Sequence, residues 1–252
     1  MTSIYNNFRI NTGFSIPKTT GFQGKVNSYL PKVSFGNDGY VTNPLLENFG
    51  TKAEIEAAAK TNPRIKEVLN EYNLPVRVNA DELEKLKNGH LQSTRITAAK
   101  IYSNLPAELK QEVDAQALQE AAMFHDYGKV LIPDKILNKN GELNEAEWAV
   151  MQQHAELGAE LLKDKNISPR AKELVKFHHQ DRGGKGYPAV NSGYEYGLDS
   201  EILSVADKYE ALTEQRSYKD AMTREEALAV IENDVKKGLV SQEVFDALKK
   251  AV

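Results

Sequence analysis

The chain of 252 residues contains no cysteine, which excludes disulfides, thiolate metal ligands and thiol nucleophiles. It has no apolar stretch long enough to span a bilayer and no apolar signal core at its N-terminus, so we expect a soluble, cytoplasmic protein without a membrane partner. A basic excess is also lacking, because 32 Lys and Arg face 36 Asp and Glu for a formal net charge of -4. Bulk attraction to nucleic acid is therefore not expected, and a phosphate-bearing ligand needs a local site.

Strand-like alternation of apolar and polar residues is nearly absent as well, which predicts an all-α fold. Residues 1–50 are polar and broken by glycine, and we interpret them as a non-helical, flexible or extended N-terminal segment. The alternative is an arm whose scattered aromatic side chains dock on the globular part or on a partner. Residues 51–252 form the helical domain, in which apolar residues recur at intervals of three and four. The predicted helices span residues 52–60, 63–72, 80–103, 107–127, 144–163, 169–179, 199–214, 223–237 and 241–250.

Several of these helices carry start signals. Two have the sequence of a capping box, one has proline in its first turn, and one follows a serine that can accept a hydrogen bond from the first turn. The residues that carry the signals are Asn144 with Glu147, Thr223 with Glu226, Ser168 before Pro169, and Ser241.

The chain has five histidines, and helical spacing places them on apolar faces. A lone histidine on such a face is usually a core residue that is satisfied by hydrogen bonds. We favour that role for His90 taken alone. For His154 taken alone, a core role and a ligand role are equally supported. The adjacent pairs His125-Asp126 and His178-His179 are harder to explain in this way, because two imidazoles at a helix end repel when charged and need partners when neutral. Asp207 lies in an apolar helix, where an unpaired carboxylate is costly.

Metal coordination satisfies all of these groups. Imidazoles with carboxylates and without thiolates suit first-row ions, with iron or manganese favoured and zinc as an alternative. Seven side chains are too many for one ion, and they suit two divalent ions that share a bridging carboxylate. The predicted metal ligands are His90, His125, Asp126, His154, His178, His179 and Asp207.

The order of these motifs resembles the HD superfamily of metal-dependent phosphohydrolases, and more narrowly its HD-GYP family, from about His90 to Val252. The first matching block runs from His125-Asp-Tyr-Gly-Lys129 through Ile132-Pro133 to His154 and Gly158. The second runs from His178-His179 to Gly186-Tyr187-Pro188, and the third from Ala206-Asp207 to Tyr218-Lys219-Asp-Ala221. An isolated His-Asp pair is a weak signal, whereas this ordered set is highly specific.

The resemblance implies an all-helical bundle around a metal centre and hydrolysis of cyclic dinucleotides, chiefly cyclic di-GMP. It implies that Asp126 bridges two ions, one completed by His90, His125 and Asp207 and the other by His154, His178 and His179. Asp126 and Lys129 are then the catalytic residues, and a signalling protein is a further expected partner. The positions that match substrate contacts of the family are Lys129, Gly186, Arg216 and Lys219.

Four positions depart from the family pattern. Gln180 replaces the usual glutamate after the paired histidines, Gly183 replaces an aspartate, and Glu210 replaces an aspartate one turn after Asp207. Leu86 stands where three-metal members have a glutamate, so we expect two metals. Two alternatives stay open: another HD-type phosphohydrolase on nucleotides or phosphomonoesters, and a catalytically weak, metal-binding signalling scaffold. The complete ligand set favours an enzyme, while Gln180 and Gly183 favour the scaffold.

Overall fold

The computed structural model describes residues 34–35, 41–42, 44–190, 193–215 and 221–252. The regular elements among these residues are helices, apart from the two-residue strands β1 (Ser34–Phe35) and β2 (Val41–Thr42), which pair antiparallel. The predicted all-α class is confirmed. None of the helices in these ranges has the length and apolarity that crossing a membrane requires.

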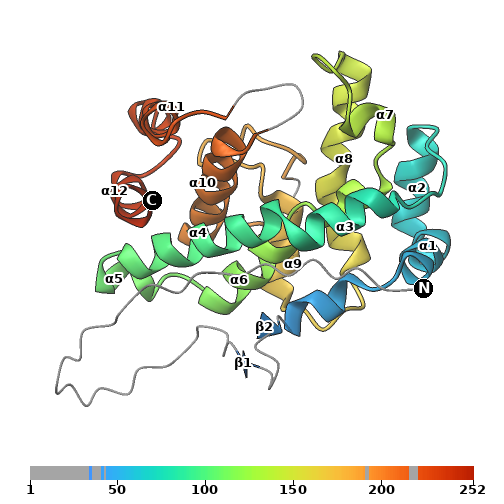
Figure 1. Cartoon of the computed structure of the whole chain (residues 1–252), viewed down its shortest axis with the longest axis horizontal. Coiled ribbons are helices and arrows are strands. Elements are labelled where there is room, and N and C mark those ends of the chain that lie inside the picture. The colour runs from blue at the N-terminus through green and yellow to red at the C-terminus, as the bar shows by residue number, and fades with distance from the viewer. Residues whose placement is uncertain (1–33, 36–40, 43, 191–192, 216–220) are drawn as a thin grey trace. The chain divides into compact units, whose positions relative to one another are not determined.

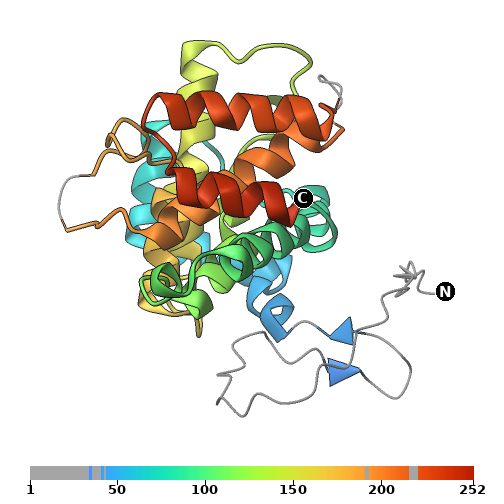
Figure 2. The same ribbon diagram turned by 90° about the vertical axis from the view of Figure 1, so that its left-hand side faces the viewer.

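Five helices surround the centre of the domain (Figures 1 and 2). They are α4 (His90–Asn104), α6 (Ala115–Phe124), α8 (Glu145–Leu161), α9 (Pro169–Phe177) and α10 (Leu198–Thr213). Helix α6 packs on α4, α9 and α10, while α8 packs on α9 and η2 (Tyr127–Leu131). Nearly every side chain of α6 is buried, so its C-terminal end delivers the residues that follow into the interior.

The remaining elements enclose this centre. In chain order they are η1 (Pro44–Phe49), α1 (Lys52–Thr61), α2 (Pro63–Glu71), α3 (Ala80–Asn88), α5 (Ala107–Lys110), η2 (Tyr127–Leu131), α7 (Asp134–Leu137), α11 (Arg224–Lys236) and α12 (Gln242–Ala251). Helices α11 and α12 lie side by side, and α12 also packs on α4 (Figures 1 and 2).

The predicted start signals are confirmed. Capping boxes form between Asn144 and Glu147 and between Thr223 and Glu226, where each partner satisfies a backbone N–H of the other. The Ser168 hydroxyl accepts from the N–H of Ala171 ahead of α9, and Ser241 does the same for α12. Local capping chemistry therefore fixes where these helices begin.

Two predicted helices are broken in the structure. The helix expected over residues 80–103 is two helices that meet at Gly89, whose backbone (φ -137°, ψ -119°) leaves the helical region. The helix expected over residues 107–127 is the short α5, a turn, α6 and then η2. A new helix begins after Asp114, because the carboxylate of this N-cap residue accepts a hydrogen bond from the N–H of Ala117.

Of the predicted N-terminal segment, the structure describes the two short strands and the stretch from residue 44 to residue 50. There the backbone forms η1, and the Phe49 side chain is fully buried. Its ring centroid lies 4.7 Å from that of Phe124 and 5.2 Å from that of Tyr127. Phe49 is thus part of the core, as the docking alternative for the aromatic residues anticipated.

Candidate metal centre

The seven predicted metal ligands come together from three helices and from the residues that directly follow two others. His90 opens α4, His154 lies in α8 and Asp207 lies in α10. His125 and Asp126 follow directly after α6, and His178 and His179 follow directly after α9. Helix ends placed at the centre of the bundle thus carry four of the seven side chains.

These side chains form two groups of converging ligand atoms. His154, His178 and His179 make one group, and His90, His125 and Asp126 make the other; within each group one ligand atom per residue lies within 4.8 Å of the others. Asp207 joins the second group, because its Oδ1 lies 3.0 Å from Nε2 of His90 and 3.3 Å from Nε2 of His125.

Asp126 connects the two groups. Its Oδ1 lies 3.4 Å from Nε2 of His154, while its Oδ2 lies 3.6 Å from Nε2 of His125. The two oxygens of one buried carboxylate therefore face different histidine groups, which is the position that a carboxylate shared by two ions needs.

Three of the histidines are oriented in the same way. The Nδ1 of His125 lies 3.0 Å from the carbonyl of Ala122, that of His154 lies 2.7 Å from Met151, and that of His178 lies 2.8 Å from Val175. A carbonyl only accepts, so each Nδ1 carries a hydrogen and each ring directs its Nε2 into the centre, where the Nε2 is bare when the ring is neutral.

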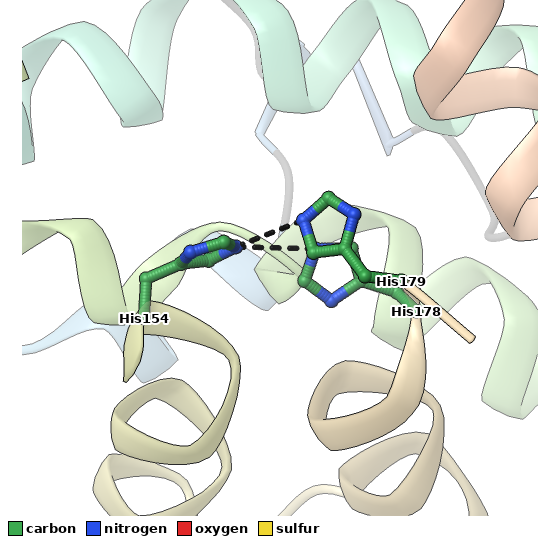
Figure 3. A group of neighbouring side chains, drawn as sticks. All are labelled: His154, His178 and His179. Carbon is green, nitrogen blue, oxygen red and sulfur yellow. Dashed lines mark hydrogen bonds between the residues drawn. The ribbon is translucent and has the colours of Figure 1, made fainter. Parts of the chain in front are cut away.

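This orientation leaves unprotonated nitrogens facing each other. The Nε2 atoms of His154 and His178 are 3.3 Å apart, and Nε2 of His179 lies 3.2 Å from Nε2 of His154 (Figure 3). Between His154 and His178 there is no hydrogen to share, because both rings carry it on Nδ1. Two lone pairs at this distance are favourable when a cation lies between them, so these residues fit a metal ion.

The pKa values agree with this assignment. Burial lowers the pKa of His154 from its usual 6.5 to about 3, and burial also lowers the pKa values of His178 and His179. All three rings are therefore neutral at physiological pH, the form that binds metal.

His125 behaves differently. Burial lowers the pKa of His125, but the charges of Asp126 and Asp207 outweigh burial and raise it. Lys129 and His125 hold the pKa of Asp126 well below its usual range, and His125 and His90 do the same for Asp207, in both cases against the opposing effect of burial. The buried Nε2 of His125 makes no hydrogen bond to any described residue, so this group also calls for a cation.

Lys129 lies at the edge of the centre. Its Nζ is 2.6 Å from Oδ2 of Asp126, and 22% of the side chain is exposed. The structure thus places a fixed positive charge beside the connecting carboxylate and in reach of a ligand.

Gly186 packs against the backbone of His179. A Cβ there would lie 1.9 Å from the carbonyl oxygen of His179, and Tyr187 pairs with His179 in a β-bridge. The absence of a side chain at Gly186 lets the loop lie directly on the His179 backbone. Its predicted role toward substrate stays a prediction, and Arg216 and Lys219 lie outside the described residues.

A cleft of about 1160 Å³ opens onto both groups of ligands. His90, Asp126, Lys129, His154 and His179 are among its lining residues. The sequence interpretation missed the aromatic and charged residues that line this cleft. Trp148 could have been identified from the sequence, because it lies on the same predicted helix as His154. The wall residues that it did not identify include Glu82, Lys85, Lys139, Trp148 and Glu214.

Comparison with protein families places residues 77–242 in the family described as the HD domain. A 3′3′-cGAMP-specific phosphodiesterase of Vibrio cholerae is 41% identical over 117 residues, which cover 46% of this chain and 22% of that protein. A cyclic di-GMP phosphodiesterase of Thermotoga maritima is 38% identical over 141 residues, covering 55% of this chain and 38% of that protein. The chain thus spans less than half the length of these curated relatives.

A longer match is to a cyclic di-GMP phosphodiesterase of Vibrio cholerae, 29% identical over 83% of this chain and 44% of that protein. Among solved structures, an HDG"Y"P protein from Bdellovibrio bacteriovorus has a TM-score of 0.51 at 17% identity, over 81% of this chain and 66% of that one. At this identity the structural likeness concerns the fold, and it agrees with the predicted helical bundle.

Proposed function

We propose that this chain, which belongs to the HD domain family as its motifs indicated, is a metal-dependent phosphodiesterase that hydrolyses cyclic dinucleotides such as cyclic di-GMP. The observation that carries the proposal is the cleft of about 1160 Å³, because residues of both groups of ligands line it. That volume is somewhat above the roughly 300–1,000 Å³ of most small-molecule sites and suits a ligand with two bases and two phosphates. The printed activities of the relatives from Vibrio cholerae and Thermotoga maritima support the same substrate class.

We infer two divalent ions, with iron or manganese favoured over zinc. His90, His125 and Asp207 would hold one, His154, His178 and His179 would hold the other, and Asp126, whose two oxygens face the two groups, would be a ligand to both. When bound, the ions supply Lewis acidity toward a phosphoryl oxygen and make water a better nucleophile near neutral pH. The inference rests on imidazole and carboxylate donors in two groups.

The residues of the chain have separate tasks in this mechanism. The backbone carbonyls of Ala122, Met151 and Val175 fix the rings of His125, His154 and His178, so no reorientation accompanies binding. Lys129 holds positive charge at the mouth of the centre, where it offsets the negative charge of the substrate phosphate. Gly186, Arg216 and Lys219 remain our proposed contacts to the phosphates or bases.

Gln180 bears on the alternative of a weak enzyme or scaffold. Its amide nitrogen donates to the carbonyl of Pro188, and its side chain is buried. The amide therefore anchors the loop that follows His179, a task for which an ionised glutamate has no donor. This contact explains why glutamine stands at position 180 without requiring that the protein has lost turnover.

Turnover of the purified chain, loaded separately with iron, manganese and zinc, tests the proposal. The substrates are cyclic di-GMP, 3′3′-cGAMP, cyclic di-AMP, GMP and an aryl phosphate. Preferential hydrolysis of a cyclic dinucleotide supports the proposal. Equal efficiency on all substrates favours the general phosphohydrolase, and metal binding without turnover favours the scaffold. Action in the cytoplasm and a signalling protein partner stay predictions.

A further inference from the structure

Trp148 is exposed although it is the largest apolar side chain of the chain. It retains 47% of its accessible surface, lies in the first turn of α8 and lines the cleft. It is also the only tryptophan in the sequence. A large ring left in contact with water inside a cleft marks a surface on which a ligand can be buried.

A series of aromatic rings leads from Trp148 to the ligand groups. The ring centroid of Trp148 lies 6.0 Å from that of Tyr187, with the planes at 82°. Tyr187 stacks on His179 at 4.4 Å and 29°, so one face of the tyrosine is covered. Two ring-to-ring steps therefore separate Trp148 from a predicted metal ligand, and Tyr187 also lies edge-to-face with His154 at 6.3 Å.

The other lining residues suit a planar group with a polar edge. Leu143 and Met151 add apolar surface to the cleft, while Asn138 and Glu142 add exposed acceptors and a donor. A nucleobase has a π face for the tryptophan and hydrogen-bonding atoms along its rim. A simple phosphomonoester has neither.

We propose that Trp148 is the stacking platform for a purine base of the ligand whose phosphate lies at the histidine groups. The proposal rests on the proposed function for the identity of the phosphate site, but it concerns the base. Tyr187 meets that base at its edge and is itself held by His179. Because stacking accepts any π face, Trp148 supplies affinity for a base-bearing ligand and leaves the choice of base to polar atoms.

Tryptophan fluorescence, excited selectively over the tyrosines, tests this directly, since Trp148 is the only tryptophan in the sequence. The full chain is titrated with GMP, which presents a base and a phosphate, and with ribose 5-phosphate, which presents only the sugar and phosphate. We expect saturable quenching or a spectral shift with GMP and none with ribose 5-phosphate. The same response to both ligands, or none to GMP, overturns the platform.

Steady-state kinetics provide the second readout. We expect Trp148→Ala to raise KM for a cyclic dinucleotide roughly tenfold and to change kcat less than twofold, because stacking of one base contributes on that scale. Trp148→Phe keeps a ring and should restore most of the affinity. Ile96→Ala is the matched control: Ile96 is 49% exposed and lies on α4, away from the lining of the cleft.

The outcomes separate this inference from the proposed function. Selective quenching by GMP without turnover of any cyclic dinucleotide sinks the phosphodiesterase and leaves the platform standing. Turnover with an unchanged KM in Trp148→Ala and no quenching sinks the platform and leaves the phosphodiesterase. If Trp148→Ala does not fold, the wild-type titration and the Phe variant still decide.

Discussion

Gly128 lies directly against the backbone of His154. A Cβ on Gly128 would stand 2.0 Å from the carbonyl oxygen of His154 and 2.5 Å from the backbone nitrogen of Gly158. Gly158 returns the contact, since its own Cβ would stand 3.0 Å from the nitrogen of Gly128. These two glycines bring η2 against α8 backbone to backbone, which sets the 3.4 Å contact between Asp126 and His154.

Gly128→Ala should therefore disturb both the fold and the metal centre. The added methyl meets backbone atoms that cannot rotate away, so η2 must move from α8 at a cost on the order of 3 kcal/mol. We expect a lower Tm and a loss of bound metal in elemental analysis. Gly183→Ala is the control, because its Cβ meets the side chain of Asp181 at 3.1 Å in an exposed turn. An unchanged Tm for Gly128→Ala contradicts this packing.

Asp126→Ala and Lys129→Ala should separate metal binding from catalysis. Asp126 faces both histidine groups, so its loss should remove metal and activity together. Lys129 contacts the centre at Asp126 and as an ammonium donates no lone pair, so Lys129→Ala should keep metal and slow hydrolysis. Metal content and kcat of both variants are the measurements. A metal-free Lys129→Ala protein refutes this division of roles.

The metal-free protein should lose stability as the pH falls from 7 to 5. His154 keeps a pKa of about 3 when folded but returns to about 6.5 when unfolded, so in this window the unfolded chain binds the extra proton. His178 acts in the same direction, whereas the raised pKa of His125 opposes it. Tm measured with a chelator should thus fall with pH, and less steeply in His154→Asn. A Tm independent of pH in the native sequence is the contrary result.

The convergence of the seven predicted ligands was predictable because the sequence places most of them in local motifs. His125-Asp126 and His178-His179 are adjacent in sequence, and each pair follows a helix whose apolar spacing points inward. Breaks within periodic stretches were not predictable, because residues 80–103 keep a helical period through Gly89 and tertiary packing decides where the helix stops. The Gly128–Gly158 contact joins residues far apart in the chain, and a single sequence does not reveal such pairs.

Phe49 tests how far the core extends toward the N-terminus. A chain that begins at residue 44 keeps Phe49, and we expect a Tm near that of the full chain, as the composition of residues 1–50 predicts. Phe49→Ala in the full chain should cost about 3–5 kcal/mol, because its ring is buried against Phe124 and Tyr127. Chemical denaturation of both proteins provides the comparison. If Phe49→Ala lowers the free energy of unfolding only slightly, the boundary between the N-terminal segment and the helical domain lies at residue 50, as predicted.

Gln180→Glu reverses the departure from the family pattern and should weaken the protein. The amide of Gln180 donates to the carbonyl of Pro188, and a carboxylate at this buried position meets that carbonyl without a hydrogen to share. We expect a loss of roughly 1–3 kcal/mol at pH 7. The loss should shrink at pH 5, where protonation of the new carboxyl supplies a donor again. Gln111→Glu, at an exposed position, controls for the added charge. If Gln180→Glu instead raises both stability and turnover at pH 7, Gln180 replaces a glutamate that full activity needs. That result would support the weak-enzyme alternative.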